Sequence, residues 1–449
     1  MKKNELLTKD INTLIKQIAI PSSIGMFFNT MYNVVDTFYA GMISTVAITA
    51  LSYSFMVFFL FLSISMGLSS AITAHVGNSL GKHKHKLSQI FVANGITFIA
   101  IISSLLCFVG FIFLSDIFSL LGAKGEALQL SLDYTNIILI GMIPMLLSMG
   151  INAALLAKGD TKSYRNTLVF GFILNLILDP LFIYGYGIIP AFGFKGVAYA
   201  TILIQFITFL YIVYKLYKTE LLHLKNPKMF LPDFRIYKKI FQQALPMSLN
   251  MFTMSLGTML IMYFVSFYGY KTVAAFGIGY RVEQIILLPM LGLNTAVSTI
   301  VANNYGAKNF DRIVEVIHKA LKYGYIMSAI GVVFLFFFGK LIIMAFDSDI
   351  EVVNTAYTYV MIESIIFFAF ITLFIANSTL QGIKQPFIIP YISLYRQIIM
   401  PLIFLYIGVV YFECSVTVAW ILIGIIIYSA AIWVYFYMKR KLRELKIKI

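Results

Sequence analysis

Long apolar runs separated by short polar segments fill the chain. Each run is about as long as the 17 to 25 residues that a helix needs to cross a bilayer. We expect twelve spans, at residues 14–40, 46–76, 88–114, 128–157, 165–186, 196–217, 240–267, 272–303, 320–346, 352–380, 386–411 and 416–438. Runs such as IILIGMIPMLLSMGI do not alternate apolar with polar residues, as a membrane β-barrel would require. The pattern predicts an all-α polytopic membrane protein with twelve transmembrane helices.

Composition supports this class. Of the 449 residues, 60% are hydrophobic and only 12% are charged, and the mean hydropathy is +0.89. Cys107 and Cys414 lie within or beside apolar runs, so neither a disulfide framework nor a metal-binding cysteine cluster is expected. The N-terminal segment MKKNELLTKDINTLIKQ lacks the compact apolar region and cleavage site of a signal peptide, so we expect it to be retained.

The net charge of +15 follows the topology. The N-terminal segment and every second polar segment after it carry most of the Lys and Arg residues. The intervening segments carry only Lys124, Lys195, Lys271 and Lys340. We expect a protein of the bacterial inner membrane, and by the positive-inside rule both of its termini are cytoplasmic. The charge is therefore topological, and nucleic acid is not an expected partner.

The two halves of the chain resemble each other. The segment GLSSAITAHVGNSLG (67–81) aligns with GLNTAVSTIVANNYG (292–306) at a separation of 225 positions, as from Gly67 to Gly292. The same separation links three further identical pairs: Pro21 with Pro246, Tyr134 with Tyr359, and Asn152 with Asn377. Several matches at one separation indicate a duplicated structural unit.

The repeat predicts the domain organisation. We expect an N-lobe over residues 1–217, a cytoplasmic linker over 218–239 and a C-lobe over 240–449. Six spans per lobe is an even number, so a pseudo-two-fold axis along the membrane normal relates the two lobes. Transporters are commonly built from such repeats, with the substrate site between the halves.

Two acidic residues lie at membrane depth in the first half alone. At the repeat separation Asp36 falls opposite Ile261, and the alignment of Pro180 with Pro401 places Asp179 opposite Met400. Ionisable residues inside a membrane are costly and mark functional sites by default. The asymmetry favours a functional role over a structural one.

The acids belong to a larger set of oxygen-bearing side chains. Tyr32 and Asp36 share one helix face at a spacing of four, as do Asn175 and Asp179. Pro180 removes the donor that would bond the carbonyl of Leu176, so we expect a free oxygen beside them. Thr201 and Asn152 complete the expected cavity.

This set of hard oxygen atoms suits Na⁺ better than zinc or copper. The candidate Na⁺ ligands are Asp36, Asn175, Asp179 and Thr201. The two neighbouring carboxylates also repel each other and can share a proton. Pro21, which cannot bond Gln17, is the expected hinge of the first span.

The chain resembles the multidrug and toxic compound extrusion (MATE) family over nearly its whole length. The segments that carry the resemblance are IPSSIGMFFNTMYNVVDTFYAG, GLSSAITAHVGNSLGKHK, LLAKGDTK, NLILDPLFIYGYGIIPAFGFKGVAYAT and GIGYRVEQIILLPMLGLNTAVSTIVANNYGA. The resemblance implies a V-shaped pair of six-helix lobes that exchanges an inward cation for an outward organic substrate. It also implies that Asp36, Asn175, Asp179 and Thr201 form the N-lobe cation site of the DinF-like branch, with Tyr32 and Asn152 beside it.

The C-lobe departs from part of the family pattern. The NorM-like branch carries an acid in the tenth span, where this chain has Phe370. Glu283 matches a family acid near the central cavity, and Arg281 could partner it only across a turn or through another helix. A buried ion pair that fixes the eighth span is an equal explanation of Glu283. We expect Glu363 and Asp133 to be polar groups near helix ends or satisfied by neighbours.

The sequence thus predicts a secondary transporter and no enzyme. The expected ligands are small-molecule drugs or toxic organic cations, with Na⁺ or H⁺ as the transported ion, membrane lipids around a monomer, and no cofactor. A chain without a phosphate-binding Gly-Lys loop is not expected to use ATP. A lipid or lipid-linked sugar flippase remains the alternative, although the acidic cavity favours cationic substrates.

Overall fold

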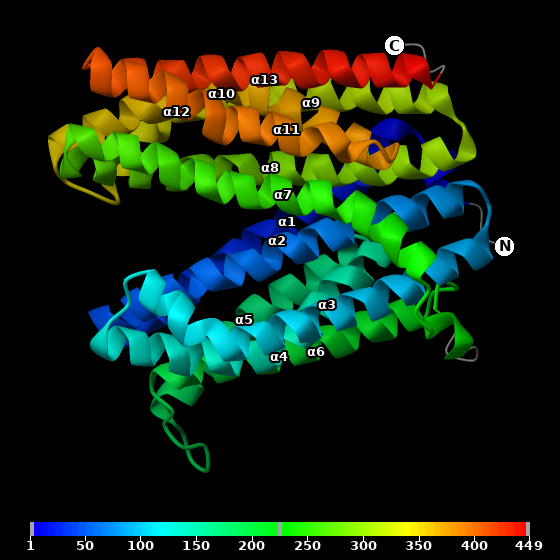
Figure 1. Cartoon of the computed structure of the whole chain (residues 1–449), viewed down its shortest axis with the longest axis horizontal. Helices are drawn as coiled ribbons and strands as arrows, with labels where there is room; N and C mark the ends of the chain where they lie inside the picture. Colours follow the sequence, from blue (N-terminus) through cyan, green and yellow to red (C-terminus); the bar gives the residue numbers. More distant parts are fainter. Residues whose placement is uncertain (1–3, 223–226, 446–449) are drawn as a thin grey trace. The chain divides into compact units, whose positions relative to one another are not determined.

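A computed structural model describes residues 4–222 and 227–445. Contacts divide the chain into two compact units. The N-unit comprises the described residues of Ile24–Ser248, and the C-unit comprises those of Met1–Ser23 and Leu249–Ile449. Within each unit, long helices run side by side (Figure 1).

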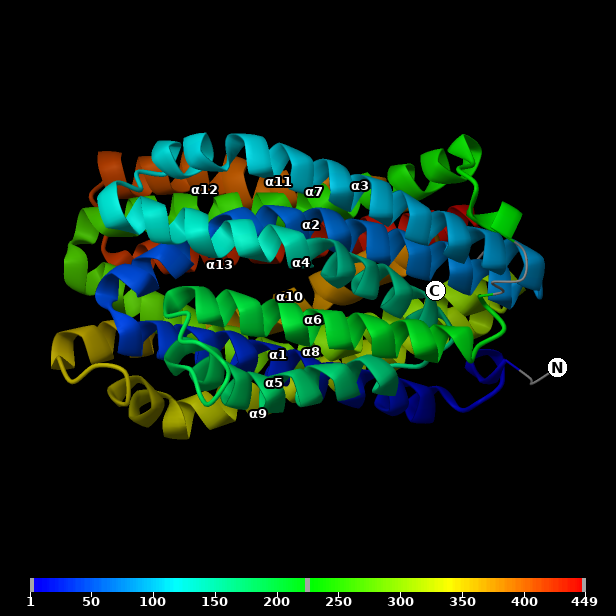
Figure 2. The ribbon, with the colours of Figure 1, turned by 90° about the horizontal axis from the view of Figure 1, so that it is seen from below.

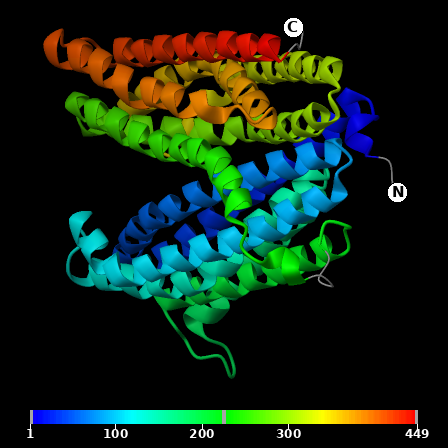
Figure 3. The same cartoon turned by 45° about the vertical axis from the view of Figure 1, so that its right-hand side comes forward.

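The N-unit is a helical bundle. Its helices are the greater part of α1 (Ile11–Ile43), then α2 (Thr45–Gly81), α3 (His85–Leu120), α4 (Gly125–Ala157), α5 (Lys162–Tyr184), α6 (Phe194–Tyr217), the short η2 (Pro227–Phe230) and the start of α7 (Phe234–Val265). α4 packs against α2, α3 and α6, while α5 packs against α6. The α5–α6 connection projects from one end of the bundle (Figure 3).

The C-unit repeats this arrangement. Its elements are η1 (Glu5–Leu7), the start of α1, the end of α7, η3 (Ser266–Tyr268), α8 (Tyr270–Ala307), α9 (Phe310–Met344), α10 (Ile350–Gly382), η4 (Pro386–Ile388), α11 (Ile389–Leu394), η5 (Tyr395–Ile399), α12 (Met400–Leu405), η6 (Tyr406–Tyr411) and α13 (Val416–Glu444). α10 packs against α8, α9 and α13, as α4 packs in the N-unit. Most of the span windows of α4 and α10, 61% in each, are buried, which places these helices at the centres of their bundles.

The expected twelve spans each coincide with helical structure. In the described residues, eleven helices are long and apolar enough to cross a membrane. The twelfth, α1, is 33 residues long but has no stretch apolar enough to be counted with them. α2 and α8 have 37 and 38 residues, and at about 1.5 Å per residue they are longer than a hydrocarbon core of about 30 Å. Their last turns therefore extend beyond the apolar runs that the sequence shows.

The eleventh span is irregular where the fifth is regular. α5 is a continuous α-helix through Pro180, but η5 and η6 are π-helical segments on either side of α12. Single π-helical turns within α-helices occur frequently at functional sites. This difference distinguishes the two units at equivalent places of the repeat.

The unit boundary cuts α1 and α7 at equivalent positions. Each helix is continuous, yet it passes from one unit to the other after Ser23 in α1 and after Ser248 in α7. These boundaries lie two residues after Pro21 and Pro246. The first turns of α1 thus belong with the C-terminal half of the chain, whereas the sequence-based division assigned them to the N-lobe.

The segment expected to be the linker is partly structured. Residues 223–226 lie outside the described part, and α7 begins at Phe234. Asn94 on α3 makes two hydrogen bonds to the segment before α7. Its Nδ2 donates to Met229 O at 3.2 Å, and its Oδ1 accepts from the Asp233 N–H at 3.0 Å. Residues 229–233 therefore dock onto α3.

Candidate functional site

The N-unit brings its two buried acids together. Asp36 lies on α1 and Asp179 on α5, and the amide of Asn175, one turn before Asp179, lies between them. Asn175 Nδ2 donates to Asp36 Oδ1 and to Asp179 Oδ1, each at 2.9 Å. All three side chains are buried, and the two carboxyl groups are within hydrogen-bonding reach of each other. We call Asp36, Asn175 and Asp179 the acid cage.

Two oxygen atoms of the cage lack a partner. Asn175 Oδ1 and Asp179 Oδ2 are buried and accept no hydrogen bond from the described residues. Buried polar atoms are normally satisfied, so such atoms indicate a site that binds something. Both oxygens are hard ligands of the kind that bind Na⁺ or hold a proton.

Hydroxyl groups border the cage. The Tyr32 hydroxyl, one turn before Asp36, donates to Thr201 Oγ1 on α6 at 3.2 Å. Tyr134 on α4 also hydrogen-bonds Thr201, and its ring stacks on Phe194 with centroids 5.3 Å apart. Thr201 is thus linked to the cage through tyrosines, and no direct bond to either carboxylate is present among the described residues.

The carbonyl beside Pro180 is not free. Tyr39 on α1 donates its hydroxyl to Leu176 O at 3.3 Å, so the expectation of an unoccupied oxygen was wrong. Removal of a backbone donor by proline leaves an acceptor that a neighbouring helix can satisfy. Here the acceptor ties α1 to α5 next to the cage.

Asn152 does not join this group. It lies on α4 five turns after Tyr134, about 27 Å further along the helix at about 1.5 Å per residue. Its Oδ1 is buried without a hydrogen-bond partner among the described residues. The expectation that Asn152 shares a cavity with Asp36 was therefore wrong, because the two residues lie at different depths of the bundle.

The C-unit buries a second charged group. Tyr359 on α10 donates its hydroxyl to Glu283 Oε2 on α8 at 2.7 Å. Arg396 on η5 is buried and acts electrostatically on both Glu283 and Glu363. Its guanidinium lies 5.7 Å from the ring centroid of Phe370. We call Glu283, Glu363 and Arg396 the C-unit triad.

The family of the chain follows from a direct match. The family model named MatE matches twice, over residues 21–181 and 246–407. The chain belongs to the MATE family. The two matched segments begin 225 positions apart, as the sequence repeat requires.

Other MATE-like proteins support this membership. The chain is 29% identical over 70% of its length to the "Probable multidrug resistance protein YoeA" of Bacillus subtilis, of which it covers 69%. It is 27% identical over 80% of its length to the "FAD transporter" of Shewanella oneidensis, of which it covers 80%. A MATE structure described as an "outward-facing conformation of a multidrug resistance MATE family transporter" superposes with a TM-score of 0.91 at 25% identity, covering 99% of both chains.

Two expectations about acids of the MATE chain need correction. Arg281 is exposed and does not partner Glu283, because residues two apart on a helix point to different sides. Glu283 accepts its hydrogen bond from Tyr359, and the charge of Arg396 acts on it electrostatically. Glu363 lies in the middle of α10, away from both helix ends, and its Oε2 has no hydrogen-bond partner among the described residues.

Asp133 fits the expectation of a satisfied polar group. Its Oδ2 lies 3.2 Å from Lys195 Nζ, and its Oδ1 accepts from Gln129 at 3.2 Å. Asp133 is therefore held in place by its neighbours, unlike the buried acids of the two units.

Sequence reasoning missed three residues of these groups: Tyr39, Tyr134 and Arg396. Tyr134 was visible as one of the repeated identities. Arg396 could have been found from the alignment of Pro180 with Pro401, which places it opposite Asn175.

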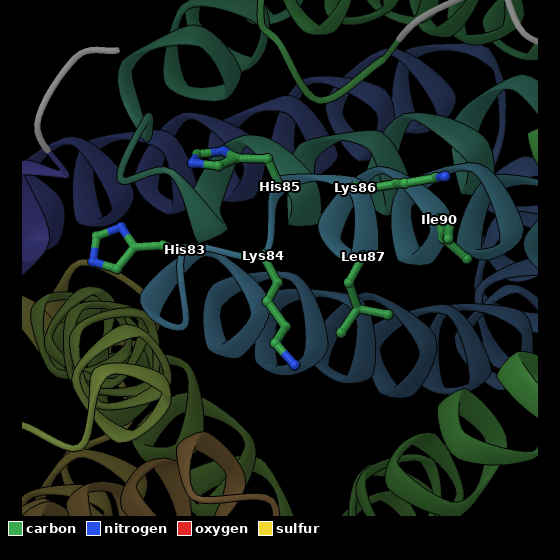
Figure 4. A pocket seen from close by; sticks show the side chains of 6 residues that line it. All are labelled: His83, Lys84, His85, Lys86, Leu87 and Ile90. Atoms are coloured by element: carbon green, nitrogen blue, oxygen red, sulfur yellow. The ribbon is translucent and has the colours of Figure 1, made fainter.

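A separate basic pocket lies at the turn between α2 and α3. The side chains that line it are His83, Lys84, His85, Lys86, Leu87 and Ile90 (Figure 4). Figure 2 shows α2 and α3 side by side along the bundle. The pocket is part of the basic polar segment after the second span and contains no carboxylate, so it is unrelated to the acid cage.

Proposed function

We propose that this MATE chain is a secondary active multidrug efflux transporter, which exchanges inward Na⁺ or H⁺ for outward organic, mostly cationic substrates. One observation carries the proposal: Asn175 Nδ2 donates to the carboxylates of both Asp36 and Asp179 in the bundle interior. Two carboxylates this close repel unless a proton or a cation lies between them. The acid cage is therefore a site for a small cation.

The donor set supports Na⁺ or H⁺ as the coupling ion. The unpartnered oxygens of Asn175 and Asp179 offer acceptors to Na⁺ in addition to the oxygens already in use. A proton shared by the two carboxyl groups would neutralise the same charge. With Thr201, the residues of the cage are the four positions that the resemblance to the DinF-like branch assigns to an N-lobe cation.

Coupling to substrate follows from the path of α1. This helix begins in the C-unit, passes into the N-unit after Ser23 and carries Asp36 there. Pro21, which cannot bond Gln17, lies at that boundary and is the proposed hinge. A cation that draws α1 towards α5 favours one conformation, and a substrate that binds the other conformation better competes with it. Each ligand then weakens the other by the same factor.

The substrate class is proposed as organic cations, because the acid cage gives the N-unit interior a negative character. One relative is named an FAD transporter. FAD is an anionic dinucleotide, so it is the substrate to compare with organic cations. We place the protein in a bacterial inner membrane as a monomer, with both termini cytoplasmic, in accord with the distribution of Lys and Arg.

Uptake into inverted membrane vesicles, whose cytoplasmic face is on the outside, tests the proposal under separately imposed Na⁺ and H⁺ gradients. We expect a cationic dye to be transported under at least one of the two gradients and FAD under neither. Dye movement that needs no ion gradient contradicts the exchange mechanism. Gradient-driven transport of FAD with no transport of dye contradicts the substrate class.

A further inference from the structure

The C-unit triad is a buried group of ionisable side chains that the proposed exchange does not use. Glu283 on α8, Glu363 on α10 and Arg396 on η5 are all more than nine-tenths buried. In the described part of the chain, Glu283 and Arg396 are the charged groups that act on Glu363. α8 adds Tyr280 beside Glu283, and Tyr359 lies one turn before Glu363 on α10.

α13 contributes an uncharged aromatic side chain next to Tyr359. The Trp420 ring lies edge-on to Tyr359 with centroids 5.2 Å apart, and Trp420 Nε1 is buried without an acceptor among the described residues. Phe276 also packs edge-on to Tyr359, with centroids 5.3 Å apart. Tyr359, which binds Glu283, is thus held by two aromatic side chains.

The charges of the triad do not balance. Two ionised glutamates against one guanidinium leave one negative charge in a helical bundle. Arginine stays protonated in proteins, so the imbalance cannot be corrected on Arg396. An uncompensated buried charge is strongly unfavourable, and a single bound proton on one glutamate would remove it.

The hydrogen bonds show which glutamate takes the proton. Glu283 accepts a short hydrogen bond from Tyr359, which stabilises its ionised form. Glu363 Oε2 accepts none from the described residues. A buried carboxylate oxygen without a donor destabilises the ionised form, so the proton belongs on Glu363.

A comparison of the two repeats shows why Na⁺ cannot take the place of the proton in the C-unit. The alignment of Pro180 with Pro401 places Arg396 opposite Asn175. Asn175 donates to two buried carboxylates, whereas Arg396 acts electrostatically on two. In the N-unit the central group is a neutral amide, so two negative charges await a cation. In the C-unit the central group is itself a tethered cation, which repels Na⁺ from the same place.

We propose that Glu363 is a proton-binding site of the C-unit that excludes Na⁺, and that it fills and empties independently of the acid cage. The step is the reversible protonation of the Glu363 carboxylate, with Glu283 remaining ionised, hydrogen-bonded by Tyr359 and stabilised by the charge of Arg396. The inference does not depend on the proposed exchange at Asp36 and Asp179.

Infrared difference spectroscopy on the purified full-length protein in lipid tests this site. The starting protein carries Asp36→Asn and Asp179→Asn, so the acid cage contributes no carboxyl signal. We expect a carboxylic acid C=O band at neutral pH that disappears on strong alkalinisation and is unchanged by Na⁺. Adding Glu363→Gln should remove this band, whereas adding Glu351→Gln, at an exposed end of the same helix, should leave it.

A second variant covers the case in which Glu363→Gln does not fold. Arg396→Gln removes the only cation of the triad, so we expect a second carboxyl group to become protonated and the band to double. Persistence of the band in Glu363→Gln, its loss on adding Na⁺, or an unchanged band in Arg396→Gln would each overturn the proposal. Because the cage is absent throughout, none of these outcomes bears on the exchange at Asp36.

Discussion

Ser248 of α7 lies directly against Gly67 of α2. A Cβ atom on Gly67 would come within 2.6 Å of Ala244 O and would also overlap the Ser248 hydroxyl. That hydroxyl donates to Ile64 O at 3.4 Å across the same crossing. The glycine therefore allows the two helix backbones to approach closely, as small residues commonly do between membrane helices.

The C-unit contains the same crossing. Ser23 of α1 lies against Gly292 of α8, where a Cβ atom would overlap the serine hydroxyl and Ala19 O. Ser23 Oγ lies 3.4 Å from Pro289 O. In each unit, one serine of the helix that passes between the units therefore packs against one glycine of a neighbouring helix.

Gly67→Val should destabilise the protein, because the added side chain meets backbone atoms that cannot move aside. Overpacking of this kind costs about 1–3 kcal/mol. Thermal unfolding of the purified protein followed by fluorescence measures the loss. The matched control is Gly277→Val, since a Cβ there meets nothing within 4 Å. Equal melting temperatures for the two variants would contradict the close crossing.

Asp36→Asn should abolish gradient-driven efflux while the protein still inserts and folds. The amide keeps the shape of the side chain but removes the charge that holds the cation. We expect dye transport no greater than in vesicles that lack the protein. Asp133→Asn, which removes a partly exposed acid paired with Lys195, is the control and should retain transport. Full efflux by Asp36→Asn would rule out the acid cage as the coupling site.

Asn175→Ala should lower the melting temperature, because both carboxylates of the cage lose a donor. Hydrogen bonds to charged groups contribute about 1.5–3 kcal/mol each. A cation bound to the folded state offsets the loss, so we expect the deficit to shrink in high Na⁺ or at acidic pH. Asn166→Ala, at an exposed position of the same helix, is the control. A deficit that is the same in Na⁺, choline and acid would contradict cation binding.

Tyr39→Phe tests whether the Tyr39 hydroxyl only stabilises the fold next to the cage or also affects ion binding. It removes the hydrogen bond to Leu176 O, which is worth about 0.5–1.5 kcal/mol, without touching a cage oxygen. We expect a small fall in melting temperature and an unchanged Na⁺ dependence of that temperature. Loss of the Na⁺ dependence would mean that Leu176 O contributes to the ion site only while Tyr39 holds it in position.

Part of the acid cage follows from the sequence because the spacing of Asn175 and Asp179 is local. Spacings of four place Asn175 and Asp179 on one face of α5, and the repeat isolates Asp36 as an acid without a counterpart. The contact between α1 and α5 was inferred from the shared chemistry of their side chains. The hydrogen bonds through Asn175 Nδ2 agree with that inference.

The errors arose where the outcome depends on long-range packing. Helical periodicity gives the face on which Asn152 lies but not the depth at which other helices present their polar groups. Likewise Pro180 frees the carbonyl of Leu176, but only the fold brings the Tyr39 hydroxyl to it. The π-helical turn of η5, which positions Arg396, has no signal in the apolar pattern.

The equivalent place in the C-unit differs from the acid cage in its chemistry. The position opposite Asn175 holds Arg396, and the position opposite Asp179 holds Met400. α7 passes close to this segment, since a Cβ on Gly257 would lie 2.6 Å from Gln397 Cβ. Ile261 lies one turn after Gly257 on this helix, and Arg396 is the neighbour of Gln397 in the chain.

Moving the acid between the repeats tests whether this difference is functional. In a protein that carries Asp36→Ile, we expect Ile261→Asp not to restore dye efflux, because Arg396 would pair with the new carboxylate and leave no charge for an exchangeable cation. Adding Arg396→Asn and Met400→Asp reproduces the side chains of the cage in the C-unit, and this variant should regain a Na⁺-dependent melting temperature that Ile261→Asp alone lacks. Efflux restored by Ile261→Asp alone would show that the two units are interchangeable. The asymmetry of the acids would then have arisen by drift, and the assignment of coupling to the N-unit would be wrong.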